Sequence, residues 1–372
     1  MKNINIIHLV LGKANPERMN GVNRVVHQLA NTQAALGQSV TIWGIANDLI
    51  ANYPERNCPT VLFQQHKNKK LCPQLKAAIN KLKGDYVLHI HGAFILEFYQ
   101  VARLLKQKEI PYVFTPHGAF AKAAMQKNKW VKRIYFQLIE KFLVENAKAV
   151  QLLGEGEYKH LSAMTNVGTR KLIPNGMDFQ QIPTDLSPKN KETLTFGFLG
   201  RLDTYHKGLD LMLKGFKKYL DKGGKGQLEL IGDGEDRPAL EKLATDLGIM
   251  ENITFHGALF GLKKFHTLHQ FDVFLHTSRM EGFPMAVLEA AALAIPCVTS
   301  EATNINTYIR AYDAGIPLPN NTPNGIASIM SVCSDLYHQN QLSFLGKNAK
   351  EMVSTAFDWK KIAQELYQTY AA

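Results

Sequence analysis

Short apolar runs alternate with amphipathic stretches along nearly the whole chain, and this pattern predicts strands separated by helices. Most runs are apolar at consecutive positions, which is typical of strands that are buried on both faces of a parallel sheet. In the first half we expect such strands at residues 4–11, 39–44, 86–91, 112–117, 149–153 and 171–174. The 3.6-residue period predicts helices at residues 23–36 and 130–147.

The alternation stops in a polar stretch at residues 180–191 and restarts at Leu194. Further strands are expected at residues 228–232, 253–257, 273–277 and 296–300, with helices between them. Repeated βα units predict an α/β protein with two doubly wound, Rossmann-like sheets. We therefore expect domains at residues 1–176 and 177–356, and an amphipathic C-terminal helix within 357–372 that packs back on the first domain.

Composition agrees with a two-domain intracellular protein. A chain of 372 residues that is 45% hydrophobic is long enough for two cores. Its four cysteines are far apart and show no C-x-x-C spacing, so neither a disulfide framework nor a structural zinc site is expected, and a cytoplasmic location is favoured. No apolar run approaches the length that spans a bilayer, so any membrane contact should be peripheral.

The net charge of +11 is concentrated in the first half of the chain. Residues 65–84 carry six lysines and no acid, and residues 121–150 carry seven basic and two acidic residues. This predicts a negatively charged partner, and phospholipid head groups, a lipid-linked diphosphate and nucleic acid all fit. The segment 127–148 suits either a core-packed helix with a basic rim, which we expect, or a helix lying at an anionic membrane surface.

The segment Glu281-Gly-Phe-Pro-Met-Ala-Val-Leu-Glu289 is the strongest candidate site. It follows a predicted strand, and Pro284 suits the first turn of a helix. Amides of Gly282 and Phe283 at that helix start would favour a diphosphate, and the two carboxylates can accept hydrogen bonds from sugar hydroxyls. This predicts a sugar-nucleotide site; the alternative is that Glu281 caps the helix and Glu289 lies on a solvated face.

At these residues the chain resembles the retaining glycosyltransferases of family 4, which carry an E-x7-E motif. The resemblance extends over nearly the whole sequence, in the same order, through the segments Asn20-Gly21, Thr115-Pro-His-Gly118, Ile173-Pro-Asn-Gly-Met-Asp178, Gly200-Arg-Leu, His206-Lys-Gly208, Leu230-Ile-Gly-Asp-Gly234 and Phe255-His-Gly257. It implies the GT-B fold, in which two Rossmann-like domains face each other across a cleft that donor binding closes. The first domain would then bind the acceptor and the second the nucleotide sugar.

The resemblance also implies roles for individual side chains. Arg201 and Lys207, just after a predicted strand, would neutralise the departing diphosphate without a metal ion. His117 would contact the transferred sugar, and Glu281 and Glu289 would hold sugar and ribose hydroxyls. The donor would also touch Gly21 in the first loop and the residues that follow Glu281, namely Gly282, Phe283, Pro284 and Met285.

Four further residues are candidates on weaker grounds. Asn20 and Gly21 lie in the first loop, where a glycine lets backbone amides approach a phosphate or the acceptor. His91 is interpreted as lining the cleft and His89 as a core residue, because no third metal ligand is spaced to match them. Glu155 follows a predicted strand and fits the cleft and the plain surface equally well.

The sequence thus predicts a retaining, metal-independent hexosyltransferase without a cofactor. The expected donor is a UDP-sugar, with a GDP-sugar second, and the acceptor is a glycan or lipid-linked glycan of cell-surface polysaccharide synthesis, at the inner face of the membrane. A sugar-nucleotide epimerase or phosphorylase of the same fold is one alternative, and a non-catalytic sugar-nucleotide or nucleic-acid binding protein is another. No nucleic-acid motif is present, so we expect no nucleic-acid partner, and no G-x-G-x-x-G follows either first strand to bind NAD.

Overall fold

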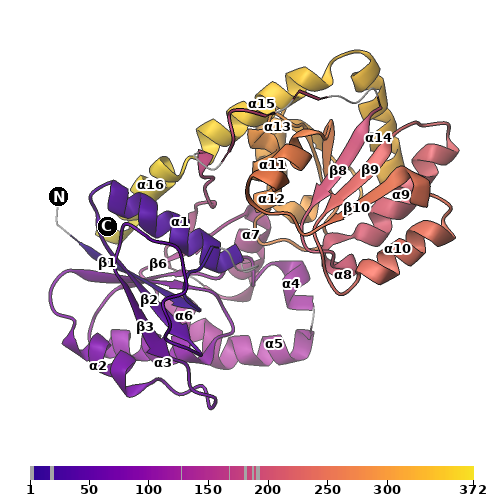
Figure 1. Cartoon of the computed structure of the whole chain (residues 1–372). Helices are drawn as coiled ribbons and strands as arrows, with labels where there is room; N and C mark the ends of the chain where they lie inside the picture. Colours follow the sequence, from indigo (N-terminus) through magenta and orange to yellow (C-terminus); the bar gives the residue numbers. More distant parts are fainter. Residues whose placement is uncertain are drawn as a thin grey trace. The chain divides into compact units, whose positions relative to one another are not determined.

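Two compact units make up the chain in the computed structural model (Figure 1). Unit 1 comprises Met1–Gly176 and Trp359–Ala372, and unit 2 comprises Met177–Asp358. The structure describes residues 4–16, 21–126, 128–166, 168–179, 182–186, 188–189 and 193–372. Within this described part, no helix is both long and apolar enough to cross a bilayer.

The sheet of unit 1 is parallel, with the strand order β3-β2-β1-β4-β5-β6-β7. Its strands are β1 (Asn5–Leu11), β2 (Ser39–Ala46), β3 (Thr60–Gln64), β4 (Tyr86–His91), β5 (Tyr112–Thr115), β6 (Ala149–Leu152) and β7 (Arg170–Leu172). Because β1 lies between β2 and β4, the chain order reverses there, and ligands of such sheets bind at the carboxyl ends of these strands.

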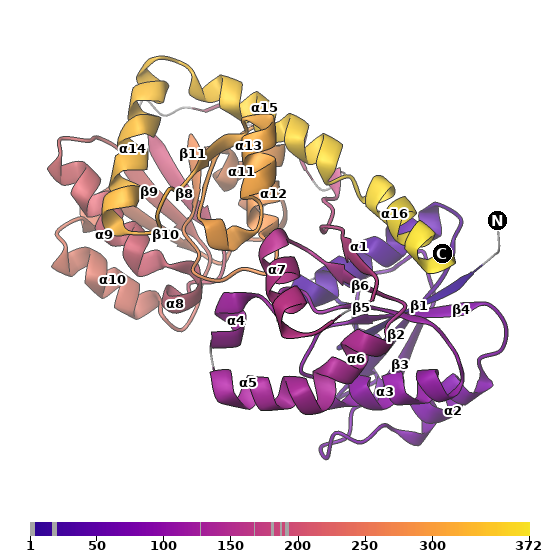
Figure 2. The ribbon, with the colours of Figure 1, turned by 180° about the vertical axis from the view of Figure 1, so that it is seen from behind.

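Helices cover both faces of this sheet (Figures 1 and 2). On one face α1 (Gly21–Ala35) lies beside α16 (Trp359–Ala371), and apolar side chains of both helices share a core with β1. On the other face α2 (Pro73–Lys81), α3 (Leu96–Gln107) and α6 (Lys141–Asn146) enclose a second core. The remaining helical segments of unit 1 are α4 (Lys122–Gln126), α5 (Lys129–Tyr135), the π-helix η1 (Phe136–Glu140) and α7 (Glu155–Met164).

Unit 2 repeats the plan with the parallel order β10-β9-β8-β11-β12-β13. Its strands are β8 (Thr195–Leu199), β9 (Gln227–Ile231), β10 (Ile253–Gly257), β11 (Val273–His276), β12 (Cys297–Thr299) and β13 (Gly315–Pro317). The reversal of chain order falls between β8 and β11. The prediction of two Rossmann-like α/β sheets is therefore confirmed.

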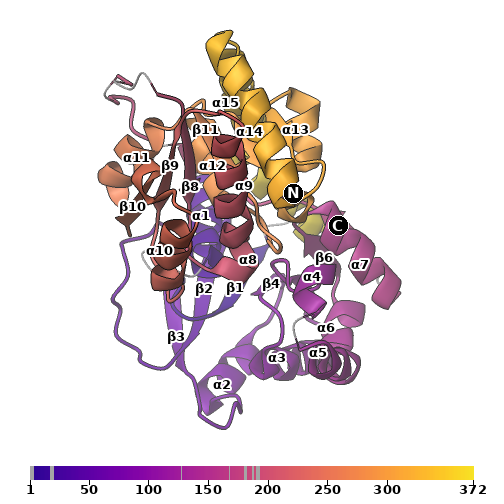
Figure 3. The ribbon, with the colours of Figure 1, turned by 90° about the vertical axis from the view of Figure 1, so that its right-hand side faces the viewer.

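The helices of unit 2 also lie on both faces of its sheet. On one face α9 (Leu209–Asp221) packs beside α14 (Pro323–His338), as Figure 3 shows, and both contribute to the apolar core. The other helices are α8 (Thr204–Lys207), α10 (Arg237–Asp246), α11 (Gly261–His269), α12 (Met285–Ala292), α13 (Asn306–Tyr312) and α15 (Leu342–Ala356), with short 3-10 turns η3 (Met250–Asn252) and η4 (Glu301–Thr303).

The structure corrects one expectation about the basic segment 127–148. Its helix forms as α5, η1 and α6, but the first part is not packed into the core. The side chains of Trp130, Val131, Ile134 and Leu138 are 60–71% exposed, whereas Phe136 and Leu143 are buried. Helical periodicity identifies an apolar stripe, but it does not say which of two apolar stripes the rest of the protein covers.

Candidate functional site

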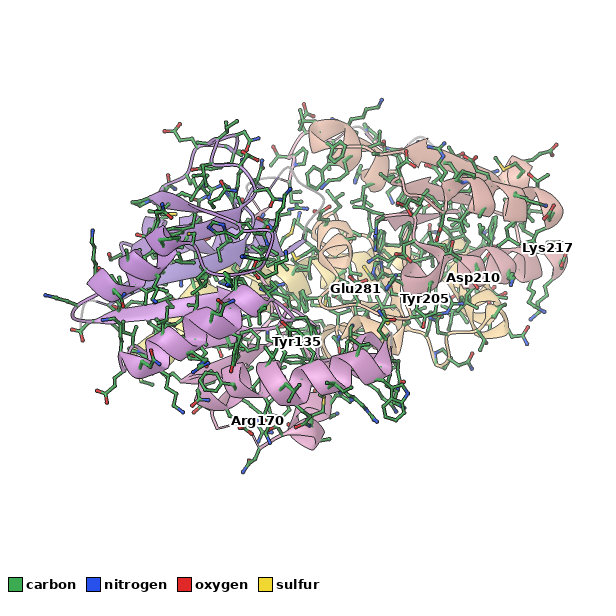
Figure 4. The ribbon with its side chains drawn as sticks, turned by 90° about the horizontal axis from the view of Figure 1, so that it is seen from below. Tyr135, Arg170, Tyr205, Asp210, Lys217 and Glu281 are labelled. Atoms are coloured by element: carbon green, nitrogen blue, oxygen red, sulfur yellow. The ribbon has the colours of Figure 1, made fainter. Side chains whose placement is uncertain are left out.

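The candidate site of unit 2 lies at the carboxyl ends of β8 and β11, where the strand order reverses. Two loops meet there. The loop after β8 carries Arg201 and leads into α8, and the loop after β11 carries Glu281 and leads into α12. Figure 4 shows Tyr205, Asp210 and Lys217 at increasing distance from Glu281 along α8 and α9.

Glu281 is the centre of a hydrogen-bond cluster. Its Oε2 accepts from Lys207 Nζ at 2.5 Å, and from His276 Nε2 and Ser278 Oγ at 3.2 Å each. Burial tends to raise the pKa of this carboxyl, but the His276 hydrogen bond and the Lys207 charge outweigh that effect and lower the pKa to about 2. Glu281 is therefore ionised and paired with the Lys207 ammonium. That ammonium has further N–H groups that can donate to an anionic ligand.

Lys207 is held in place by a close approach between two loops. It ends α8, and the next residue, Gly208, has φ 64° and packs against the backbone of Thr277, so that a Cβ at Gly208 would collide with the carbonyl oxygen of Thr277. The amides of Arg279 and Met280 donate to the His206 carbonyl at 2.8 and 3.2 Å. These backbone bonds clamp the two loops together.

An ion pair reinforces this clamp. Arg279 Nη1 and Nη2 donate to the two carboxylate oxygens of Asp210 at 2.7 and 2.8 Å, which is the bidentate geometry of a strong arginine–carboxylate pair. Asp210 stands in the first turn of α9, and Arg279 lies two residues before Glu281. The relative position of Lys207 and Glu281 is thus fixed by backbone and side-chain bonds.

The start of α12 offers backbone amides. Asn304 Nδ2 donates to the carbonyl oxygens of Glu281 and Gly282 at 3.0 and 3.3 Å, which fixes the orientation of these peptides. Among the described residues, the amides of Gly282 and Phe283 donate to no acceptor. Pro284, at the helix N-cap, contributes no amide hydrogen and no side-chain cap. Two amides and a helix N-terminus therefore remain available to an anion.

The other expected donor residues surround this helix start. Phe283 and Pro284 are buried, and the Phe283 ring packs on Phe357 with the centroids 5.6 Å apart. Met285, the first residue of α12, is partly exposed. The apolar packing anchors the loop beside the two amides, an arrangement that favours a site positioned before a ligand binds.

Glu289 lies deeper on the same helix. Its side chain is 3% exposed, and its Oε2 accepts from Lys264 Nζ of α11 at 2.7 Å. The alternative interpretation is therefore wrong for Glu289, which does not lie on a solvated face. It is also wrong for Glu281, because the carboxylate is bonded to Lys207, His276 and Ser278 instead of capping α12.

Arg201 stands apart from the Glu281 cluster. Its side chain is 59% exposed, and Nη2 donates to Asp203 Oδ2 at 2.8 Å. Asp203 in turn accepts from the amide of His206 at 2.8 Å and so caps α8. Arg201 is thus anchored at the start of the helix that carries Lys207, with an exposed guanidinium.

Sequence reasoning missed His276, which donates to Glu281 from the last position of β11. Its ring is 1% exposed, and burial lowers its pKa, so it is a neutral hydrogen-bond donor. Its Nδ1 is buried and has no partner among the described residues. A polar residue inside an otherwise apolar strand, five positions before Glu281, was the only signal in the sequence.

In unit 1, His117 lies just after β5 and not within a strand. Its φ of 54° ends β5 at Thr115, two residues earlier than expected. The half-buried ring brings Nε2 to 3.1 Å from His91 Nδ1, and burial lowers the pKa of His117 to about 3. His117 is therefore a neutral imidazole.

Two buried glutamates brace the loops around His117, and no pattern in the sequence singles them out. Glu157 of α7 accepts from the amide of Phe120 at 3.1 Å, and Glu140 of η1 accepts from the amide of Phe94 at 2.8 Å. Burial raises their pKa values, to about 7 for Glu157 and about 8 for Glu140, more than these bonds lower them. These two hydrogen bonds therefore fix the loops that follow β4 and β5.

His91 does not line a surface, since it is 1% exposed. The expectation that no third histidine matches His89 and His91 is also wrong. His8 of β1 lies beside both, with one nitrogen of each residue within 4.8 Å of the others. The pairing of β1 with β4 brings His8 opposite His89, and only the strand order could have revealed it.

The remaining candidates lie on the surface or outside the described residues. Gly21 is the first residue of α1 and is exposed, whereas Asn20 falls outside the described part of the chain. Glu155 is exposed at the start of α7, and its carboxylate accepts from Lys159 Nζ at 3.0 Å.

A pocket of about 510 Å³ with both polar and apolar lining residues opens at the carboxyl ends of β1 and β2. Its lining includes Gly12, Asn23, Asn47 and the fully buried Lys13, whose ammonium donates to Asp48 and, at 2.8 Å each, to Ile50 O and Asn52 Oδ1. The pocket lies where ligands of such sheets bind. Another pocket, of about 650 Å³, includes Asp272 and Pro296, which precede β11 and β12, and so lies at the opposite end of the unit 2 sheet.

Comparison with known proteins matches both halves of the chain to glycosyltransferase families. Residues 19–181 match the model of Glycosyltransferase Family 4, and residues 183–352 match that of Glycosyl transferases group 1. The chain is 31% identical over 176 residues to an uncharacterized glycosyltransferase of Methanocaldococcus jannaschii, covering 46% of this chain and 43% of that protein.

It is also 25% identical over 299 residues to one chain of the human phosphatidylinositol N-acetylglucosaminyltransferase, covering 76% of this chain and 57% of that protein. The chain spans about half the length of several curated relatives that it matches.

The solved structure of Anabaena HepE in complex with UDP and glucose superimposes with a TM-score of 0.77 at 16% identity, over 99% of both chains. At this identity the likeness concerns the fold alone. Because the two family matches adjoin and together span residues 19–352, the chain belongs to the family 4 type of glycosyltransferases and has the GT-B fold.

Proposed function

We propose that this glycosyltransferase is retaining and metal-independent, and that it takes its sugar from a nucleotide diphosphate bound by unit 2. The observation that carries the proposal is the Lys207–Glu281 pair at the start of α12, next to the unbonded amides of Gly282 and Phe283. A cation, two amides and a helix N-terminus favour a diphosphate, and a fixed carboxylate beside them favours sugar hydroxyls.

Each donor group has a proposed partner. The diphosphate is bound by Lys207, by the exposed guanidinium of Arg201 and by the two amides, which supply the positive charge that a magnesium ion provides in other transferases. Glu281 accepts from sugar hydroxyls. Glu289 accepts from ribose hydroxyls, for which it exchanges part of its bond with Lys264.

The proposed reaction is a front-face substitution at the anomeric carbon. The bond from that carbon to the β-phosphate oxygen breaks, and its electron pair leaves with the phosphate. The acceptor oxygen bonds to the carbon from the same face, and its proton passes to the leaving phosphate. His117, as the family resemblance implies, contacts the transferred sugar, and Arg201 and Lys207 stabilise the growing negative charge.

We further propose a UDP-sugar as the donor, with a GDP-sugar second. The structural neighbour HepE, described in complex with UDP and glucose, supports this order. The transferred group would then be a hexose, bound with its hydroxyls toward Glu281.

The acceptor is proposed to be a glycan or a lipid-linked glycan of cell-surface polysaccharide synthesis, bound by unit 1 at the pocket beside Gly12 and at the nearby start of α1, Gly21. The human relative is named for a reaction on phosphatidylinositol, which supports a lipid acceptor.

An exposed apolar and basic surface on unit 1 supports such an acceptor. Trp130, Val131, Ile134 and Leu138 form an exposed apolar stripe, and Lys129 and Arg133 lie over the Trp130 ring. Exposed apolar groups mixed with cations favour the interface of an anionic bilayer. We therefore propose peripheral binding at the inner face of the cell membrane.

A donor screen tests the proposal. Thermal stability and product formation are measured with UDP-, GDP- and ADP-sugars in the presence of EDTA, because a ligand that binds only the folded state raises its stability. We expect one UDP-sugar to stabilise the protein and to be transferred with retention, which product NMR reads from the anomeric coupling. Transfer that stops with EDTA, or an inverted product, would contradict the proposal. Release of a free epimerised sugar nucleotide would favour the epimerase alternative.

A further inference from the structure

A chain of buried hydrogen bonds connects His117 to helix α1. His117 Nε2 lies 3.1 Å from His91 Nδ1, His91 Nε2 lies 2.9 Å from His8 Nδ1, and His8 Nε2 lies 2.6 Å from Gln33 Oε1. All of these groups belong to unit 1, and His8, His91 and Gln33 are at most 1% exposed. We call His117, His91, His8 and Gln33 the histidine relay.

A second branch of hydrogen bonds starts from a fixed end at Gln151 and reaches Tyr370 of α16. Gln151 Nε2 donates to the carbonyl of Ile173 at 2.9 Å, so its Oε1 faces Thr115, whose hydroxyl donates to it at 2.8 Å. With its proton engaged there, the Thr115 oxygen accepts from His89 Nε2 at 2.6 Å. Because a carbonyl can only accept, each bond in this branch has one direction.

The same donor-to-acceptor order of hydrogen bonds extends from His89 to Tyr370. With its proton on Nε2, His89 accepts at Nδ1 from the Tyr370 hydroxyl at 2.7 Å. Burial raises the pKa of Tyr370, and Gln33 lowers it by a smaller amount. Gln33 Oε1 faces His8, whereas Gln33 Nε2 is buried and has no hydrogen-bond partner among the described residues.

The orientation of Gln33 sets the direction of the relay. Gln33 Oε1 can only accept, so His8 carries its proton on Nε2 and accepts at Nδ1. His91 Nε2 then donates to His8, and His91 Nδ1 accepts from His117 Nε2. Nδ1 of His117 is left as an unprotonated acceptor, with no partner among the described residues.

We propose that the histidine relay holds His117 as the neutral Nε2–H tautomer, so that Nδ1 accepts a hydrogen bond from a hydroxyl of the bound sugar or acceptor. His91, His8 and Gln33 are positioning residues, which act only through His117. The part of the inference that concerns the sugar rests on the proposed function, whereas the tautomer does not.

Charge in the relay agrees with this assignment. Burial lowers the pKa of His8 to about 4 and of His117 to about 3, and it lowers those of His89 and His91 well below the usual value. Among the described residues, Tyr370 of α16 bonds His89 at 2.7 Å, and Glu157 accepts from the amide of Phe120 in the turn after His117. All four rings are neutral at pH 7, and a neutral ring has one acceptor nitrogen.

A shared metal ion fits these histidines less well. Two nitrogens on one tetrahedral zinc ion, each at about 2.0–2.1 Å from the metal, lie roughly 3.3 Å apart. His8 Nδ1 and His91 Nε2 are closer, at 2.9 Å, which is a hydrogen-bond distance. Every ring nitrogen of His8, His89 and His91 already has a hydrogen-bond partner.

Imidazole NMR of the full chain tests the tautomer directly. Long-range proton–nitrogen spectra of ¹⁵N-labelled protein distinguish Nδ1–H from Nε2–H, and single histidine variants assign the signals. We expect Nε2–H for all four histidines, without titration between pH 5.5 and 8. A proton on Nδ1 of His117, titration of His117 near pH 6.5, or one bound metal ion per chain would overturn the proposal.

Two variants of Gln33 separate positioning from packing. Gln33→Glu keeps an oxygen that faces His8 and should keep the Nε2–H tautomer of His117. Gln33→Leu removes this oxygen, so that the Nδ1–H tautomer of His117 should appear. His27→Gln, on the same helix but outside the relay, is the control, and its spectrum should match the wild type at His117.

Transfer kinetics complete the test. If Gln33→Leu lets the Nδ1–H tautomer of His117 become populated, kcat/KM should fall about two- to tenfold, in proportion to the fraction of protein that keeps the Nε2–H tautomer. The value should recover in Gln33→Glu. An unchanged His117 tautomer in Gln33→Leu would overturn the proposal. A protein with the expected tautomer but no sugar transfer would leave the relay standing and defeat the proposed function instead.

Discussion

Lys207 Nζ donates to Glu281 Oε2 at 2.5 Å, from side chains that are 18% and 15% exposed. Lys207 ends the short helix α8, which follows β8, and Glu281 lies in the loop that follows β11, so both come from segments next to the reversal point of the unit 2 sheet. The pair therefore joins the two loops that form the candidate donor site. It also keeps a cation in place that would otherwise be a mobile surface lysine.

Removing either member of this pair should impair turnover with little effect on the fold. We expect Glu281→Gln and Lys207→Met each to lower kcat/KM for transfer by about 10²–10³, the range found when one group that stabilises transition-state charge is lost. The double variant should lose less than the product of the two effects, because the residues act as one unit. Steady-state transfer assays measure all three.

Lys242 and Asp246 supply the matched control for that experiment. They form a lysine–carboxylate pair at 2.8 Å on α10, with side chains 74% and 56% exposed. Lys242→Met and Asp246→Asn should leave transfer within about twofold of the wild type, since an exposed pair contributes little. Near-normal transfer by Glu281→Gln would contradict the proposed site.

Glu140 should make stability depend on pH. Burial raises its pKa from 4.5 to about 8 in the folded protein, so the folded state keeps a proton that the unfolded chain releases above about pH 4.5. The stability that this proton contributes is full below that pH and is lost as the pH rises toward 8, on the order of a few kcal/mol in all.

Glu140→Gln should remove this slope. Its side-chain oxygen can still accept from the amide of Phe94, and it carries no titrating proton. Urea unfolding at pH 5, 6.5 and 8 should show the wild type losing stability relative to the variant as the pH rises. Glu155→Gln, at an exposed position, should run parallel to the wild type, and a parallel curve for Glu140→Gln would refute the assignment.

Gly208 should tolerate no side chain. Its positive φ already disfavours alanine, and a Cβ would also collide with the carbonyl oxygen of Thr277. Gly223 has a positive φ as well, but nothing lies within 4 Å of its Cβ position. Gly223→Ala should therefore lower the free energy of unfolding by about 1–2 kcal/mol, the cost of the backbone conformation alone.

Gly208→Ala should lose more than that, and it should also lower donor affinity, because the collision pushes Lys207 away from Glu281. Chemical denaturation and calorimetric titration of a UDP-sugar measure the two effects. Equal losses in the two alanine variants would show that the close approach to Thr277 is unimportant.

The exposed stripe on α5 and η1 should bind vesicles. We expect Trp130→Ser combined with Leu138→Ser to reduce sedimentation with vesicles that contain anionic lipid by about tenfold or more, since each buried apolar side chain contributes about 1.5–3 kcal/mol. High salt should weaken the remaining binding.

Phe260→Ser combined with Leu262→Ser is the control for the vesicle experiment. These two apolar side chains, at and just before α11 in unit 2, are 66% and 65% exposed. This variant should sediment like the wild type. Equal loss in both double variants would indicate non-specific adsorption.

The sequence predicted structural features that depend on residues close together along the chain. Apolar runs predicted the central strands and their parallel arrangement, but they missed the edge strands β3 and β13. The spacing from Glu281 to Glu289 pointed to the start of α12. Pairings across the sheet were not accessible in this way. His8 is far from His91 in sequence, and only the β1–β4 pairing brings their rings together.

Burial of polar groups was equally hidden from the sequence. Glu140 and Glu157 have the composition of ordinary helix surface, and their role depends on the loops after β4 and β5 that pack above them. Trp130 is the opposite case. It is an apolar residue in an amphipathic helix, yet its side chain is largely exposed. Each outcome depends on tertiary packing that residue periodicity does not encode.

Helix α16 has a consequence for the order in which the protein is made. Trp359, Ile362, Leu366 and Tyr370 complete a core with β1 and α1, yet the ribosome delivers them after all of unit 2. Unit 2 can therefore finish folding first, while the nascent first unit waits with one apolar face uncovered and vulnerable to aggregation. Tyr370 is likewise made after unit 2, so His89 gains this hydrogen-bond partner only once α16 has docked.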